Sequence, residues 1–190
     1  MSKLRDHQFI IKFMGFVIEP RLCALMELAR HGNLHKALTT ENGNLKAIHR
    51  VVHFRIVKQL ASAMSFMHHL RIIHRDIKSD NILVFSTSPD AEVLVKLTDF
   101  GTANFLTPDG MKNINGTPGY RAPEMFNFIS SDEYTTKVDI YSFAMVVGEL
   151  ITGRRPFHSL VHHQIPDALK RLERPRYTDC LLYTSDAADE

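Results

Sequence analysis

Three side chains with complementary chemistry stand close together in the segment IHRDIKSDN, residues 73–81. The Asp76 carboxylate can accept a proton, the Lys78 ammonium can neutralise phosphate, and the Asn81 amide oxygen can bind a hard cation. Asp76 alone could be a plain capping aspartate. Its spacing from Lys78 and Asn81 favours the chemical interpretation, in which the three side chains converge on one small volume.

A second candidate is Asp99, the first residue of Asp99-Phe100-Gly101. The preceding run, 93–98, predicts a strand, so this carboxylate stands at a strand end. Magnesium binds few protein oxygens and keeps phosphates and waters as its other ligands, which suits a single carboxylate in such a position. Gly101 would let the chain turn sharply away. The pattern therefore predicts a magnesium ligand at Asp99.

The elements that must position these residues follow from the apolar pattern. Apolar residues recur at helical spacing between residues 47 and 70, which predicts a helix with one buried stripe. That stripe consists of Val52, Ile56, Leu60, Ala63, Met67 and Leu70. Short β-rich runs at 82–85 and 93–98 predict two strands, separated by the turn sequence Ser-Thr-Ser-Pro-Asp. Residues 73–81 then form a loop on a rigid scaffold.

Upstream of this helix, the sequence predicts a hairpin and a short helix. The apolar runs 9–18 and 22–28 flank a proline-containing turn, which is typical of two antiparallel strands. Asn33 follows a glycine and is expected to cap a short helix that runs through Leu38.

Downstream, residues 102–121 are rich in glycine, asparagine, threonine and proline, which predicts a long loop. Residues 137–152 predict a helix ended by Gly153. This run is the most apolar in the chain, but it contains Asp139, Ser142 and Glu149. Those polar residues favour a buried globular helix over a membrane span.

The composition is that of a soluble globular protein, since 44% of the residues are hydrophobic and 23% are charged. The formal net charge of +2 is spread along the chain, which argues against a nucleic-acid-binding surface. Cys23 and Cys180 have no disulfide or metal-ligand spacing, and residues 1–12 lack a signal-peptide pattern. A cytoplasmic location is therefore expected.

Two more segments complete a series of motifs: GTPGYRAPE at residues 116–124 and Asp-Ile-Tyr-Ser at residues 139–142. With IHRDIKSDN and Asp-Phe-Gly before them, they resemble the catalytic, metal, closing and helix-start motifs of the protein kinases, in the same order. The resemblance implies an α+β fold. It would consist mainly of the helical C-terminal lobe, with an incomplete N-terminal β-sheet.

The resemblance also implies domain boundaries. Residues 1–30 would be a remnant of the N-terminal lobe, with its late strands and hinge, and residues 31–179 the C-terminal lobe without its last helices. The tail 180–190 (CLLYTSDAADE) is expected to be the translation of a sequencing-library adapter, with a genuine tail as the alternative.

The details narrow the family. Lys78 and the pair Gly116-Thr117 resemble serine/threonine kinases, and several longer stretches resemble the tyrosine-kinase-like group. Within that group the chain is similar to the Roco and leucine-rich-repeat kinases, and the insertion 86–92 fits them. This subgroup implies a GTPase-like domain in the same protein.

By motif position, the resemblance implies a role for each candidate. Asp76 would be the catalytic base, Lys78 would contact the transferring phosphoryl group, and Thr117 would support the base. Asn81 and Asp99 would hold Mg²⁺. The substrates would be ATP and a protein serine or threonine.

The resemblance also implies an adenine site at the end of the hairpin, in the hinge-like residues 26–29. Met26 would be the gatekeeper, and backbone groups of Glu27 and Ala29 would pair with adenine. Leu83 would contribute from the strand that follows the catalytic loop.

Alternatives remain for several residues. Arg75 could pair with a phosphorylated loop, with Thr107 or Thr117 as the acceptor, or could be purely structural. Glu124 is expected to form a buried ion pair, with Arg174 as the candidate partner.

The histidines carry simpler expectations. His74 is expected to be a buried packing residue. His158, His162 and His163 are expected to be surface residues and not zinc ligands.

The sequence shows no counterpart of the family's glycine-rich phosphate loop or of its Val-Ala-x-Lys strand. We therefore expect this chain alone to be inactive and poorly soluble, and its parent protein to be an active kinase. The competing hypothesis is a pseudokinase or scaffold that binds partners without catalysis.

Overall fold

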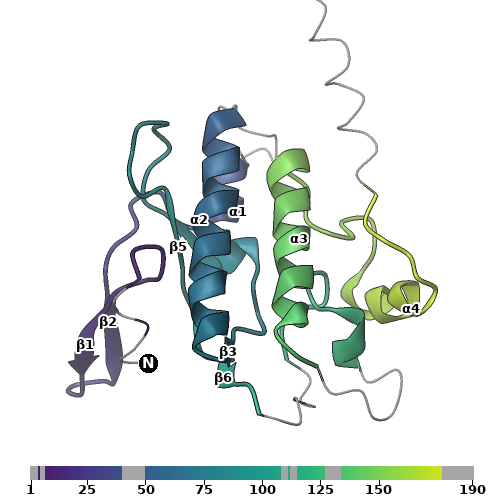
Figure 1. Cartoon of the computed structure of the whole chain (residues 1–190), viewed down its shortest axis with the longest axis horizontal. Coiled ribbons are helices and arrows are strands. Elements are labelled where there is room, and N and C mark those ends of the chain that lie inside the picture. The colour runs from purple at the N-terminus through teal and green to yellow at the C-terminus, as the bar shows by residue number, and fades with distance from the viewer. Residues whose placement is uncertain are drawn as a thin grey trace, which may run out of the picture. The chain divides into compact units, whose positions relative to one another are not determined.

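The structure is a computed structural model that describes residues 4, 7–39, 50–107, 111, 115–126 and 134–176. Its contacts divide the chain into two compact units. The first unit comprises residues 1–71 and 79–101, and the second comprises residues 72–78 and 102–190. Figure 1 shows the elements of both. The predicted tail 180–190 lies outside the described residues.

The first unit begins with the predicted hairpin. Strands β1 (Phe13–Val17) and β2 (Cys23–Met26) pair in antiparallel fashion, with Phe13 opposite Met26 and Val17 opposite Cys23. Both strands are shorter than the apolar runs that predict them. Much of the hairpin's apolar surface is exposed, including Phe16 at 66%.

A second ladder of the first unit lies around the magnesium candidates. Strands β4 (Ile82–Val84) and β5 (Val95–Leu97) pair in antiparallel fashion, with Ile82 opposite Leu97. Both were predicted, and each ends close to its predicted bounds. The short 3-10 helix η2 (Ser79–Asn81) leads directly into β4.

Two helices complete the first unit. In α1 (Leu34–Leu38), Asn33 Oδ1 accepts from the Lys36 N–H at 3.0 Å, which confirms the predicted cap. Helix α2 (Arg50–His69) packs against β5 (Figure 1). Its predicted stripe is buried from Val52 to Met67, and Leu70 at the end is half-buried. This apolar stripe therefore anchors the ladder that carries the candidate site residues.

The second unit contains the short strands β3 (Ile72–Ile73) and β6 (Asn104–Phe105), which pair in antiparallel fashion. The predicted loop 102–121 thus contains one short strand. The other elements are η3 (Pro123–Phe126), α3 (Lys137–Thr152), η4 (His162–Gln164) and α4 (Ile165–Lys170). Gly153 ends α3 with a φ of 65°, as predicted.

Two apolar clusters hold the second unit together. The first consists of Ile73, Met111, Ala122, Met125, Tyr134 and Val138, and the second of Phe157, Ile165 and Leu169. The observed mixture of small sheets and helices confirms the predicted α+β class. None of the described helices is long and apolar enough to cross a membrane.

Candidate active site

Asp76, Lys78 and Thr117 form a closed triangle of polar contacts in the second unit. The Thr117 hydroxyl donates to Asp76 Oδ1 at 2.8 Å and accepts from Lys78 Nζ at 2.8 Å. Lys78 Nζ also lies 2.9 Å from Asp76 Oδ2, with the two side chains 21% and 11% exposed. The structure therefore brings together three predicted catalytic residues, although Thr117 is distant from the other two in sequence.

Asp139 fixes the backbone just before the triangle. Its Oδ2 accepts from the His74 N–H and its Oδ1 from the Arg75 N–H, both at 2.9 Å. Asp139 and His74 are both fully buried. Arg75 has a φ of 70°, which residues other than glycine rarely adopt. The two bonds from Asp139 offset the cost of this conformation, and Asp76 follows it immediately.

The Arg75 side chain points into the second unit and is itself only 8% exposed. Its Nε donates to the Thr102 carbonyl at 2.6 Å, and its Nη1 lies 3.4 Å from the Tyr134 hydroxyl. Of the two candidate phosphate acceptors, Thr107 is exposed and Thr117 belongs to the triangle. A pairing of Arg75 with a phosphorylated loop stays a prediction.

Gly116 lets the closing segment run directly against the catalytic loop. Its φ is 90°, and a Cβ at this position would lie 2.4 Å from the Arg75 carbonyl oxygen. Both features require glycine, because a side chain would be strained and would also collide with backbone. This close approach places the next residue, Thr117, within hydrogen-bond distance of Asp76.

The expectation of a buried ion pair at Glu124 is wrong. Glu124 is exposed, and among the described residues it forms no ion pair with Arg174, which is exposed as well. The reason is the tight turn of η3, which buries Ala122 and Met125 on either side. Since neighbouring residues of such a turn face different ways, Glu124 points outward.

The closing segment, residues 116–124, contacts a different buried carboxylate, Glu149. Glu149 is fully buried, and its Oε2 accepts from the Tyr120 hydroxyl at 2.5 Å. The Tyr120 carbonyl in turn accepts from the Ser142 hydroxyl at 2.8 Å. Helix α3 therefore holds the closing segment through two polar side chains.

The two predicted magnesium ligands lie in the first unit, at the same end of the β4–β5 ladder. The Thr98 N–H donates to the Asn81 carbonyl at 2.9 Å, and Asp99 comes directly after Thr98. Asn81 is buried, whereas Asp99 is exposed and has a φ of 59°. Asp99 Oδ1 accepts from the Gly101 N–H at 3.2 Å. One carboxylate and one amide oxygen are a donor set that fits Mg²⁺.

The predicted adenine-binding segment is held by an ion pair that the sequence analysis missed. Both carboxylate oxygens of Glu27 accept from Lys96 Nζ, at 2.7 and 2.8 Å. The Lys12 N–H also donates to Glu27 Oε1 at 2.6 Å, and the Glu27 N–H donates to the Lys12 carbonyl at 3.1 Å. Leu83 lies opposite Lys96 in the β4–β5 ladder, and Ala29 follows two residues after Glu27.

An apolar cavity of about 350 Å³ lies in the first unit. It is lined by Leu4, Ile10, Ile11, Phe13, Phe16, Ala24, Met26, Thr98, Asp99, Phe100 and Gly101. The predicted gatekeeper Met26 and the predicted metal ligand Asp99 therefore border the same cavity. Its apolar walls suit a flat aromatic group better than a charged one.

The described residues contain no cluster of three or more histidine, cysteine, aspartate or glutamate side chains able to hold a metal ion. His158, His162 and His163 are all exposed. Burial lowers the pKa of another histidine, His53, whose Nε2 is buried without a hydrogen-bond partner among the described residues.

Asp139, Lys96 and Glu149 are the residues that sequence reasoning left without a role. A signal was present for Asp139 and Glu149, because each is a carboxylate inside the most apolar stretch of the chain. Such residues are rarely buried unless they accept hydrogen bonds. Lys96 alternates with buried residues along β5 and carries no comparable signal.

The geometry agrees with the comparisons to known proteins. Residues 1–182 match the family model described as the protein kinase domain. The chain therefore belongs to the protein kinase domain family.

Individual relatives are similar over most of this chain. Mouse leucine-rich repeat serine/threonine-protein kinase 1 is 37% identical over 171 residues, which is 89% of this chain and 8% of the relative. The probable serine/threonine-protein kinase gdt4 of Dictyostelium discoideum is 38% identical over 72% of this chain and 8% of the relative. Mitogen-activated protein kinase kinase kinase dlk-1 of Caenorhabditis elegans is 35% identical over 84% of this chain and 16% of its own length. The chain thus spans a small part of each.

Proposed function

We propose that the protein carrying this chain is a serine/threonine kinase that transfers the γ-phosphoryl group of ATP to a protein hydroxyl. The observation that carries the proposal is the triangle of Asp76, Lys78 and Thr117, in a chain of the protein kinase family. Phosphoryl transfer depends mainly on positioning and charge neutralisation, so a small set of fixed side chains is sufficient.

In this proposal Asp76 accepts the proton of the substrate hydroxyl, and Thr117 keeps the carboxylate oriented by donating to it. Lys78 forms an ion pair with Asp76 and contacts the transferring phosphoryl group. Asp76 Oδ1 accepts from Thr117 and Asp76 Oδ2 lies against Lys78, so the substrate hydroxyl would share one of these oxygens, since each carboxylate oxygen can accept more than one hydrogen bond.

The nucleotide would be bound by residues of the first unit. Asn81 and Asp99 would hold Mg²⁺, which neutralises phosphate charge when it is bound. Met26 would border the adenine through the apolar cavity. The Glu27 carbonyl and the Ala29 N–H would pair with the adenine edge, since no described residue bonds to either of them; Leu83 would cover its face from β4.

The test is phosphate transfer by the full-length protein to a serine- and threonine-containing protein substrate. We expect Asp76→Asn to lower kcat by about 10²–10⁴-fold, because a positioned general base contributes that much. Asp90→Asn, an exposed carboxylate in the first unit, is the matched control. Phosphoamino-acid analysis should detect phosphoserine or phosphothreonine. Unchanged transfer by Asp76→Asn, or phosphotyrosine as the product, would contradict the proposal and favour the scaffold hypothesis or a tyrosine kinase.

We also propose that residues 1–30 belong to an N-terminal lobe and residues 31–179 to a C-terminal lobe, in a cytoplasmic protein of the Roco type. Similarity to leucine-rich repeat serine/threonine-protein kinase 1 supports this. The full-length transcript tests it, because it should encode a GTPase-like domain in the same chain and a phosphate-binding lysine upstream. A transcript without either would contradict the assignment.

A further inference from the structure

The connection between β4 and β5 is a short ordered turn that presents Ser88 to solvent. The Ala91 N–H donates to the Ser88 carbonyl at 3.2 Å, which closes a four-residue turn. Pro89 occupies the second position of this turn, where its fixed φ fits. The Asp90 N–H approaches Ser88 Oγ at 3.4 Å. Residues 87–90 are all exposed, so the serine hydroxyl is accessible.

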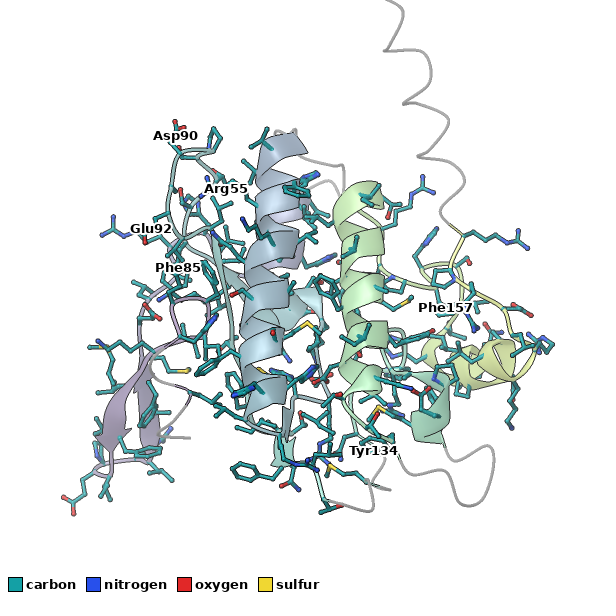
Figure 2. The ribbon with its side chains drawn as sticks, in the orientation of Figure 1. Arg55, Phe85, Asp90, Glu92, Tyr134 and Phe157 are labelled. Carbon is teal, nitrogen blue, oxygen red and sulfur yellow. The ribbon has the colours of Figure 1, made fainter. Side chains whose placement is uncertain are left out.

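A cation from helix α2 lies against this turn. The two terminal nitrogens of Arg55 donate to the carbonyls of Pro89 and Ala91. Figure 2 shows Arg55 reaching from α2 toward the loop that bears Asp90. Within the described part of the chain, Arg55 forms no ion pair with a carboxylate. Among the described residues the guanidinium therefore has neutral acceptors, although its planar geometry is suited to binding phosphate.

Gln59 fixes the base of the same turn, one helical turn after Arg55. Its Nε2 donates to the Glu92 carbonyl at 2.8 Å, and its Oε1 accepts from the N–H groups of Leu94 and Val95 at 2.9 and 3.1 Å. Gln59 is only 5% exposed. Because this buried amide ties the turn to α2, the position of Arg55 against the carbonyls of Pro89 and Ala91 is built into the fold.

We propose that Ser88 is a phosphorylation site for a proline-directed serine/threonine kinase, and that Arg55 binds the resulting phosphate. Pro89 directly after the serine supplies the recognition feature, because proline fixes φ and removes a backbone donor. The proposal does not depend on this chain's own catalytic activity.

The chemical step is an ordinary phosphoryl transfer from ATP. Ser88 Oγ forms a bond to the γ-phosphorus, and the bond from that phosphorus to the β–γ bridging oxygen breaks. ADP leaves with the electron pair, and the serine proton passes to a base of the modifying kinase. The new group carries about −1.5 to −2 charges at neutral pH and three strong acceptor oxygens. Arg55 can then exchange its neutral carbonyl acceptors for a charged one.

The first experiment tests modification. The full-length protein, carrying Asp76→Asn to exclude self-phosphorylation, is incubated with a purified proline-directed kinase and ATP, and phosphopeptides are mapped by mass spectrometry. We expect phosphate on Ser88, none on residues 86–88 with Ser88→Ala, and most of the incorporation at Ser88 lost with Pro89→Ala. The dipeptides Thr107-Pro108 and Thr117-Pro118 are the other sites of this type in the sequence and are scored on their own peptides. Modification of Ser86 or Thr87 in place of Ser88, or equal incorporation by Pro89→Ala, overturns the proposed site.

The second experiment tests the role of Arg55. Phosphorylation of Ser88 should raise the thermal unfolding midpoint of the kinase domain by about 2–4 °C, and high salt should reduce this rise. Arg55→Gln should abolish this rise, and Arg55→Lys should retain part of it. A ³¹P titration reports on the phosphate itself, whose second ionisation should occur at lower pH in the chain that retains Arg55 than in the Arg55→Gln variant. Identical titrations in the two proteins overturn the assignment of Arg55.

Discussion

Two carboxylates hold the segments that carry candidate site residues, and they do so in different surroundings. In the second unit, Asp139 is fully buried and accepts from two consecutive backbone N–H groups of the catalytic loop. In the first unit, Glu27 is 23% exposed and accepts from one backbone N–H and from Lys96. Each carboxylate anchors a segment of backbone, but Asp139 is shielded from solvent, whereas Glu27 remains in partial contact with it.

The difference predicts how each anchor responds to change. A buried acceptor that satisfies two backbone donors cannot be replaced by water, so its loss leaves those donors unpaired. The Glu27–Lys96 pair, with side chains 23% and 14% exposed, keeps partial contact with water, which screens it and can take up part of the hydrogen bonding if one partner is lost. We therefore expect the catalytic loop to be rigidly fixed and the predicted adenine segment to be adjustable.

The largest effect should come from Asp139→Ala. This change leaves the N–H groups of His74 and Arg75 without their acceptor, so the free energy of unfolding should fall by about 2–5 kcal/mol. Kinase activity should be lost as well, because Asp76 directly follows Arg75. Urea unfolding of the purified protein measures the first effect. Asp167→Asn, in an exposed pair with Lys170 at 3.8 Å, is the control and should change stability by less than about 0.5 kcal/mol. A similar loss from both variants would remove the contrast between buried and exposed anchors.

Tyr120→Phe should have the next largest effect. It removes the hydroxyl that donates to the buried Glu149 carboxylate, and hydrogen bonds to charged groups contribute about 1.5–3 kcal/mol. A double-mutant cycle with Glu149→Gln tests whether the two side chains act as a pair, because coupled residues give non-additive losses. Additive losses would show that the contact contributes little.

Lys96→Met tests the adjustable anchor. Because the pair is partly exposed, the expected loss of stability is about 1 kcal/mol or less, and it should shrink at high salt. If Glu27 positions the adenine segment, the KM for ATP should rise by about fivefold in the full-length kinase while kcat changes little. Lys96→Arg should restore most of the affinity. A fall in kcat with unchanged KM would contradict the positioning role.

The smallest expected effect is the pH dependence of stability that comes from His53 in helix α2. Burial lowers the pKa of His53 below its usual value of 6.5. The unfolded chain therefore takes up a proton as the pH falls through 6.5, while the folded chain does so only at lower pH. Stability is thus complete above that value and declines below it.

His53→Gln should make this decline on the acid side less steep in thermal unfolding between about pH 7.5 and pH 5. The exposed His158→Gln is the control and should leave the slope as it is. Some slope should remain in His53→Gln, because burial lowers the pKa of His7 as well. An unchanged slope in His53→Gln would contradict the assignment.

The sequence pattern predicted those elements of the fold that depend on interactions between residues close together in the chain. The stripe on α2 and the cap at Asn33 depend on residues a few positions apart, and both follow from periodicity and side-chain chemistry. Strand β6 (Asn104–Phe105) escaped prediction, because it is only two residues long and its pairing with β3 is non-local.

The candidate site shows the same contrast between local features, which the sequence predicts, and non-local contacts, which it does not. The segment containing Asp76, Lys78 and Asn81 was visible from residue types and spacing. The contact of this segment with Thr117 was expected only from the family resemblance. The number of residues between two distant segments does not predict whether their side chains meet. Outward rotation of Glu124 could not be predicted, since a single residue of backbone turn decides which of Glu124 and Met125 is buried.

Gly116 has a consequence for how this protein can vary. Every missense change of its codon introduces a Cβ, and that atom would lie 2.4 Å from the Arg75 carbonyl oxygen in a backbone region closed to side chains. Gly15, by contrast, has open space around its would-be Cβ. In a saturation-mutagenesis screen scored by kinase output, Gly116 should accept no replacement, whereas Gly15 should accept alanine. The two positions would then tolerate very different sets of substitutions, although both are glycine.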